Sequence, residues 1–302
     1  DATPGGNDVL RQMVNNLWGA NTPEEVHIIK TQLYSDSYHD VRIKGNDRTV
    51  SMPKAFIFTA TNLADEKKRT NLIYYDNAGE HFRPENNSAD TPGAQHVAQA
   101  DGIIFLLDPF NHNDFKRKIR DMHAEEGGDP QFDQKVSSNP DVILDEMRKR
   151  IEELTGSKRC KAPFAFVVGK SDAWREKIIP DGRTLWDPKM AANENCPAGL
   201  DLGVVEHNSE IIEEMLNDIS PGLVARAKAM SDNHMFFGTS NFGHPAVRVE
   251  RKDPENPGKT ITVPLPDPNR LNPELVDIPV LWILSQTDPG IVNSVRNPNL
   301  QL

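Results

Sequence analysis

Cysteine is scarce in this sequence of 302 residues, and long apolar runs and an excess of basic residues are missing from it. Its two cysteines, Cys160 and Cys196, have no His or Cys at metal-ligand spacing, so we expect free thiols in a reducing compartment. No apolar run approaches the ~20 residues that a membrane-spanning helix needs. The formal charge of −11 argues against a general nucleic-acid binder, which requires a basic face. With no signal peptide visible, these features predict a cytoplasmic protein.

Apolar and charged residues make up 37% and 26% of the chain, as is typical of a globular protein with a sizeable core. Segments with strand character alternate with segments of helical periodicity, which predicts an α/β three-layer sandwich with a mostly parallel central sheet. We expect one domain over residues 1–302, with an inserted loop at about 178–207 and a C-terminal hairpin and helix at about 246–290. The helix expected over 273–286 contains Pro279 and should kink there.

The chain is organised around the segment Asn-Leu-Ile-Tyr-Tyr-Asp-Asn-Ala-Gly-Glu at 71–80. Residues 72–75 are too few for a helix and read as a buried strand, paired in a hairpin with a strand at 54–61. Asp76 then lies at the carboxyl end of that strand, and Gly79 permits a sharp turn or a close approach to a ligand. In open parallel sheets, ligands bind beyond these strand ends.

Two later apolar strands end in a similar way. The strand at 164–168 runs into Gly-Lys-Ser-Asp at 169–172, and the strand at 235–237 runs into Gly-Thr-Ser at 238–240. Together with the acidic turn after residue 75, this arrangement resembles the third, fourth and fifth sequence elements of the P-loop GTPases. The resemblance implies the P-loop NTPase fold and a shared site for a guanine nucleotide (GTP or GDP) and Mg²⁺.

Each residue of the resemblance has a chemical role. The Asp76 carboxylate would hold the water shell of Mg²⁺, which takes one or two carboxylates plus phosphate oxygens. The Gly79 amide would meet a γ-phosphate. The Asp172 carboxylate would accept two hydrogen bonds from a guanine edge, with the stem of Lys170 laid across the base plane. Thr239 and Ser240 would complete the base pocket.

Within the GTPases, the chain is most similar to the bacterial double-GTPase type. The matching segments are Tyr-Asp-Asn-Ala-Gly-Glu at 75–80, Leu-Leu-Asp-Pro at 106–109, Phe-Phe-Gly-Thr-Ser at 236–240 and Pro-Val-Leu-Trp-Ile-Leu at 279–284. They extend over about residues 50–290. This resemblance implies a regulatory NTP hydrolase that converts GTP to GDP and works with a protein partner or with other domains of a larger assembly.

The chain departs from the GTPase pattern in three ways. No strand with G-x-x-x-x-G-K-[ST] precedes residue 76, so the phosphate loop either lies before residue 1, which we expect, or has been lost. Gly169 stands where Asn or Thr is usual, which weakens the expectation of guanine selectivity. Glu80 replaces the Gln that positions the attacking water in many members, so Glu80 with His81 or Arg83 would take the catalytic role.

Other readings of the same residues remain open. Gly-Lys-Thr at 258–260 resembles the end of a phosphate loop, but it leads into a proline-containing strand and is better read as a hairpin turn. The main alternative to a GTPase is a pseudo-GTPase, a scaffold or interaction module without nucleotide turnover. A third reading is a haloacid-dehalogenase-like phosphatase with Asp108 as nucleophile, but that chemistry requires a second Asp where Phe110 stands.

Overall fold

A three-stranded parallel sheet lies at the centre of the computed structural model, which describes residues 8–26, 38–42, 49–53, 55–77, 82, 92–122, 139–179, 183–191, 198–253 and 258–296. Its strands are β5 (Ile103–Leu107), β6 (Phe164–Val168) and β9 (His234–Gly238), in the order β5-β6-β9. All three form from the continuous apolar runs that predicted them. Strand β6 is buried on both faces and therefore needs no polar alternation, whereas β5 exposes alternate residues. The register places Phe105 beside Phe166 and Phe166 beside Phe236.

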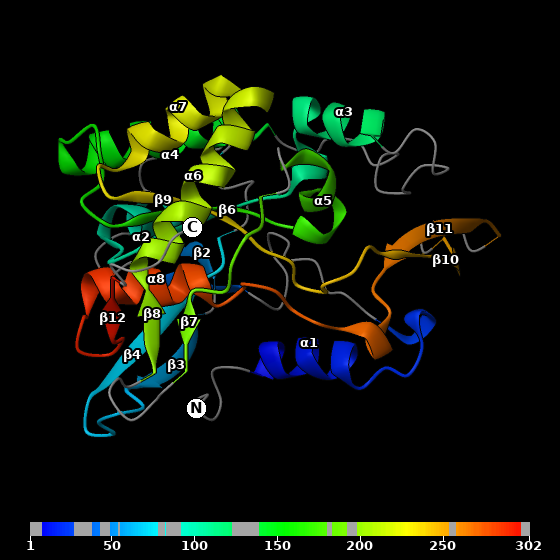
Figure 1. The fold of residues 1–302 in the computed structure, drawn as a ribbon, viewed down its shortest axis with the longest axis horizontal. Helices are drawn as coiled ribbons and strands as arrows, with labels where there is room; N and C mark the ends of the chain where they lie inside the picture. Colours follow the sequence, from blue (N-terminus) through cyan, green and yellow to red (C-terminus); the bar gives the residue numbers. More distant parts are fainter. Residues whose placement is uncertain are drawn as a thin grey trace.

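Helices cover both faces of this sheet, as the predicted α/β class requires (Figure 1). One face packs its phenylalanines against a large apolar core, and the other face packs Ala165, Val167 and Phe237 against a smaller one. The helices of the larger core are α2 (Pro92–Gln99), α3 (Asn113–Met122), α4 (Pro140–Thr155), α5 (Arg175–Ile178), α6 (Leu202–Ile219) and α7 (Pro221–Met230). Helix α8 (Ile278–Thr287) covers the opposite face.

Strand β5 is an edge strand in the described part of the chain. Ile103 and Leu107 bond through their backbones to the β6 side, with Ile103 N 3.0 Å from Pro163 O and Gly169 N 2.9 Å from Leu107 O. The backbone groups of the alternate residues Ile104 and Leu106 therefore point to the other edge, where no described strand pairs with them. Their side chains are 40% and 63% exposed.

The predicted hairpin before β5 is confirmed, and it forms a separate sheet. The prediction that its second strand is buried is wrong, because Ile73 and Tyr75 are 56% and 42% exposed. Strands β3 (Ala55–Thr61) and β4 (Arg69–Tyr75) pair antiparallel, with Phe56 opposite Tyr74. Among the described residues, this pair is not hydrogen-bonded to the parallel sheet. Ala60 and Leu72 nevertheless pack against the smaller core.

The remaining elements surround this framework. Helix α1 (Asp8–Trp18) and a 3₁₀ turn η1 (Pro23–Glu25) precede a hairpin that the sequence did not predict, made of β1 (Tyr38–Arg42) and β2 (Thr49–Pro53). A small mixed sheet joins β7 (Lys189–Met190), β8 (Gly199–Asp201) and β12 (Ser294–Val295). The predicted late hairpin is confirmed as β10 (Val247–Lys252) with β11 (Thr260–Leu265), so Gly258 and Lys259 lie in its turn region and open no helix.

The structure corrects two expectations about helices. Helix α6 begins at Leu202, and the Asp201 carboxylate caps it by accepting hydrogen bonds from Gly203 N and Val204 N. The end of the loop expected at about 178–207 is therefore strand β8 and the start of α6. The predicted kink at Pro279 is wrong, because α8 begins at Ile278 and Pro279 lies in its first turn, where a missing N–H costs nothing. Within the described ranges, no helix is long and apolar enough to span a membrane.

Candidate functional site

The loops after β6 and β9 meet at the carboxyl edge of the parallel sheet. Ser171 N donates to Thr239 O at 2.9 Å, and Thr239 N donates to Val168 O at 3.0 Å. Both loops leave neighbouring parallel strands in register, so their tips arrive side by side. The structure thus brings together four of the residues selected from the sequence, namely Lys170, Asp172, Thr239 and Ser240.

The Asp172 carboxylate is held by the second loop. The hydroxyl of Ser240, which is fully buried, donates a hydrogen bond to Asp172 Oδ1. Burial raises the pKa of the Asp172 carboxyl above its ordinary value, and the neighbouring Glu274 carboxylate adds to that rise. The Ser240 hydroxyl, the Asp172 backbone N–H and His244 act in the opposite direction. Asp172 is therefore a fixed acceptor whose ionisation depends on the groups around it.

Ser240 is itself fixed by the loop that follows it. Its hydroxyl oxygen accepts a hydrogen bond from Gly243 N at 2.8 Å. Gly243 has φ +72°, and a Cβ atom there would lie 1.9 Å from the backbone oxygen of Asn272. Only glycine fits this close approach, so the turn that orients Ser240 depends on Gly243.

Lys170 makes contacts that differ from those the resemblance implies. It adopts the left-handed conformation with φ 55°, and its Nζ lies 2.9 Å from Asp108 Oδ2 and 5.0 Å from the centre of the Phe110 ring. Asp108 also caps the turn after β5 by accepting from Phe110 N at 3.0 Å. In this structure Asp108 is thus the counter-ion of Lys170, a role that the sequence did not suggest.

The third predicted loop tip begins at Asp76, directly after β4 in the separate hairpin sheet. The neighbouring Tyr75 ring stacks on His96 of α2 with the ring centres 4.0 Å apart, and burial lowers the pKa of His96. Asn77 Oδ1 is buried without a hydrogen-bond partner in the described part of the chain. The other predicted residues of this loop, Gly79, Glu80, His81 and Arg83, lie outside the described residues.

A metal site is not visible as a cluster. Among the described residues, no group of three or more His, Cys, Asp or Glu side chains is arranged to hold a metal ion. Magnesium bound with a nucleotide takes only one or two protein carboxylates beside waters and phosphate oxygens, so such a site would not form a cluster of this kind. Asp76 remains the residue predicted for it.

The structure adds three residues to the site that sequence reasoning missed. Arg175, the first residue of α5, pairs with Glu274 in the segment before α8. Glu274 also exchanges two backbone hydrogen bonds with Ser240, and His244 lies buried in the same loop region. No local pattern marks these residues, because Arg175 and Glu274 are separated by 99 positions.

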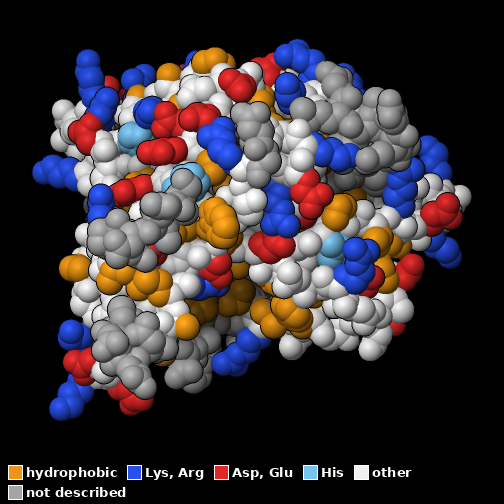
Figure 2. Space-filling model, viewed as in Figure 1, with side chains coloured by type: hydrophobic (Ala, Val, Ile, Leu, Met, Phe, Trp, Pro, Cys, Tyr) orange, Lys and Arg blue, Asp and Glu red, His pale blue; other side chains and the backbone are white. Residues whose placement is uncertain are grey.

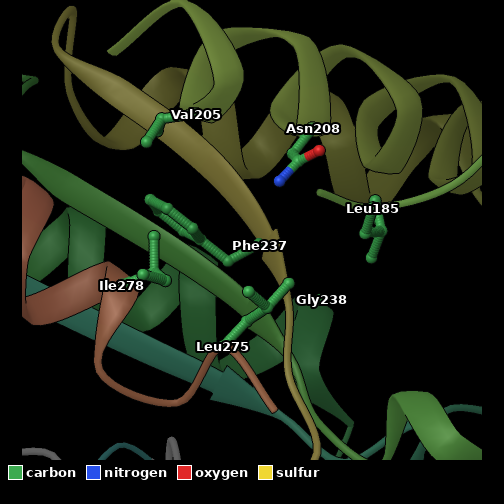
Figure 3. A pocket seen from close by; sticks show the side chains of 7 residues that line it. All are labelled: Leu185, Val205, Asn208, Phe237, Gly238, Leu275 and Ile278. Carbon is green, nitrogen blue, oxygen red and sulfur yellow. The ribbon is translucent and has the colours of Figure 1, made fainter. Parts of the chain in front are cut away.

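A small pocket lies beside this edge. It is lined mainly by apolar side chains and contains about 250 Å³ of atom-free space, part of it open to solvent. Figure 3 shows Phe237, Gly238, Leu275 and Ile278 on one side of it and Asn208 and Leu185 on the other.

Charge does not distinguish a broad binding face in the view of Figure 2. Acidic and basic side chains are interspersed there, with hydrophobic side chains gathered in and around a hollow below the centre. The site is therefore described by the small polar cluster around Asp172 rather than by a charged face. Comparison of the chain with protein-family models, with curated proteins and with solved structures gives no match.

Proposed function

We propose that this protein is a guanine-nucleotide-binding regulatory switch of the GTPase type, which hydrolyses GTP to GDP with Mg²⁺ once a phosphate-binding loop completes its site. The observation that carries the proposal is the Asp172 carboxylate, fixed by Ser240 at the carboxyl edge of a parallel sheet. An ionised carboxylate in this position can accept both N–H groups of a guanine edge. Parallel α/β sheets bind their ligands at this edge.

The phosphate and metal half of the proposed site rests on Asp76 and on a phosphate loop. The sequence contains no G-x-x-x-x-G-K-[ST] segment, so the loop would be supplied by an additional strand. The open edge of β5 offers such a strand a place, because the backbone N–H and C=O groups of Ile104 and Leu106 point outward there. Apolar side chains of the added strand would pack beside those of Ile104 and Leu106 on the same face of the sheet.

A nucleotide-binding titration tests the proposal. GTP, GDP and ATP are titrated with and without Mg²⁺ into this chain and into N-terminally longer versions that carry a Gly-rich loop ending in Lys-Ser/Thr. We expect guanine nucleotides to bind in preference to ATP, and turnover to appear only in the longer protein. In that protein Asp76→Ala should abolish Mg²⁺-dependent turnover. Equal affinity for GTP and ATP, or unchanged turnover of the Asp76→Ala variant, would contradict the proposal.

A second candidate function is a pseudo-GTPase scaffold that recognises a protein without nucleotide turnover. The exposed apolar side chains of β4 and β5 favour it, since Ile73, Tyr75, Ile104 and Leu106 are all at least 40% exposed. Exposed apolar strand edges are typical of surfaces that pair with another polypeptide. Absence of nucleotide binding in the N-terminally extended protein would favour this second function over the first.

A further inference from the structure

An ion pair connects the helix after the first loop of the candidate site to the segment before α8. Arg175 follows Asp172 by three positions and begins α5, whereas Glu274 lies in the segment that leads into α8. The two guanidinium NH groups of Arg175 contact both carboxylate oxygens of Glu274, one of them at 3.2 Å. The side chains are 34% and 22% exposed, so the pair is partly shielded from water. Two-pronged contact of this kind fixes geometry as well as charge.

The backbone of Glu274 continues the connection to the other loop. Glu274 N donates to Ser240 O at 2.8 Å, and Ser240 N donates to Glu274 O at 3.0 Å. Ser240 in turn donates through its hydroxyl to Asp172. The contacts therefore form a closed ring that runs from Asp172 through Ser240 and Glu274 to Arg175 and back along the chain to Asp172.

We propose that Arg175 and Glu274 are positioning residues for Asp172, holding its carboxylate against Ser240 so that it can read a guanine base. This inference rests on the proposed function for its nucleotide, but the ring itself is a property of the chain. Neither residue would touch the nucleotide. Arg175 also neutralises the Glu274 carboxylate, an acidic group that raises the pKa of Asp172.

The charges that face Asp172 predict a specific pH signature. His244 acts as the opposite charge and Glu274 as the like charge, while the Ser240 hydroxyl and the Asp172 backbone N–H are the hydrogen-bond donors. Removing the Glu274 charge in Glu274→Gln should lower the pKa of Asp172. Removing its partner in Arg175→Ala leaves the Glu274 carboxylate uncompensated and should raise it. A purely structural role would not shift the two variants in opposite directions.

Carbon NMR of the Asp172 carboxyl group, recorded against pH without nucleotide, tests the inference directly. We expect its titration midpoint to rise in Arg175→Ala, to fall in Glu274→Gln and to return close to the wild-type midpoint in the double variant. Arg175→Lys should restore part of the shift. Unchanged midpoints, or shifts of the same sign in both single variants, would overturn the positioning role.

A control variant and a second readout separate the positioning role from a general effect of losing an ion pair. Arg183→Ala removes a comparable Arg–Glu pair, in which Arg183 lies 2.7 Å from Glu214, and should leave the Asp172 titration unchanged. GTP titrations of the same variants form the second readout. Arg175→Ala should weaken GTP binding up to about fivefold, and as the pH is lowered GTP binding should be lost at a higher pH than in wild type. If the wild-type protein and its extended versions bind no guanine nucleotide, the proposed function fails, while the NMR titration still decides whether the ring positions Asp172.

Discussion

The carboxyl edge of the parallel sheet and the outer edge of β5 differ in how completely their polar groups are paired. At the first edge, the loops after β6 and β9 exchange backbone hydrogen bonds, and Ser240 is bonded to Asp172, Gly243 and Glu274. At the outer edge of β5, opposite β6, no described strand is paired, and the Leu106 side chain is 63% exposed. The proposed base-reading half of the site is therefore preorganised, whereas the proposed phosphate half depends on an additional segment.

Within the described residues, this difference separates a region with paired polar groups from a strand edge without a partner strand. Fixed hydrogen-bond partners lower the entropy that a ligand must remove, so the region around Asp172 needs no rearrangement to present its carboxylate. An open apolar strand edge has the opposite character, because its backbone groups and side chains gain partners only when another strand arrives. Substitutions in the two regions should have very different consequences.

The two faces of β5 give the largest expected contrast. Phe105 is buried against Phe164 and Phe166, so Phe105→Ala should lower the free energy of unfolding by about 3–5 kcal/mol through lost burial and a cavity. Leu106→Ala, one residue further along on the open face, should change it by no more than about 0.5 kcal/mol. Urea unfolding of both variants measures this, and equal losses would mean that the outer face is covered in solution.

Gly243 tests how rigid the paired edge is. An alanine Cβ would lie 1.9 Å from Asn272 O, in addition to the strain of φ +72°, so Gly243→Ala should cost about 3 kcal/mol and release Ser240. Gly156 is the matched control, because it has φ +71° but no atom within 4 Å of its Cβ position. Gly156→Ala should cost only about 1 kcal/mol, the strain alone. Thermal unfolding that ranks the two variants equally would contradict this account of the turn.

A smaller effect is expected from removing the charge of Asp172. Burial raises the pKa of this carboxyl above its ordinary value of 3.8. The protonated carboxyl therefore stabilises the fold fully below pH 3.8, and this stabilisation is lost as the pH rises through the raised pKa. Asp172→Asn should therefore melt at a higher temperature than wild type at pH 7, with the advantage shrinking at lower pH. Asp101→Asn, at an exposed position, reports the effect of removing one surface charge. A melting difference that does not vary with pH would exclude this account of Asp172.

The smallest effect is expected at Lys170. Its ammonium pairs with Asp108 at the surface, with the two side chains 36% and 31% exposed, so water screens much of the attraction. Lys170→Met keeps an apolar stem near Phe110 and should cost about 0–1 kcal/mol in urea unfolding. A loss above 2 kcal/mol would show that the pair is integral to the edge.

Much of the framework could be predicted from sequence because continuous apolar runs ended by Gly or Asp define β5, β6 and β9. Parallel strands deliver their carboxyl ends to one edge, which is why Asp172 and Ser240 were expected to meet. The hairpin β1–β2 was missed because its strands are only five residues long and the first, Tyr-His-Asp-Val-Arg, is mainly polar. The Arg175–Glu274 pair could not be found, since ionic contacts between distant segments leave no local pattern.

The central claim, that Asp172 reads a guanine base, is tested most directly by titrating GTP and xanthosine triphosphate into wild type and Asp172→Asn. An amide at this position can no longer accept both guanine N–H groups, but it can donate to the extra carbonyl of xanthine. We predict at least a tenfold loss of GTP affinity in the variant, together with a gain for the xanthine nucleotide. Equal GTP affinity of the two proteins would contradict the assignment.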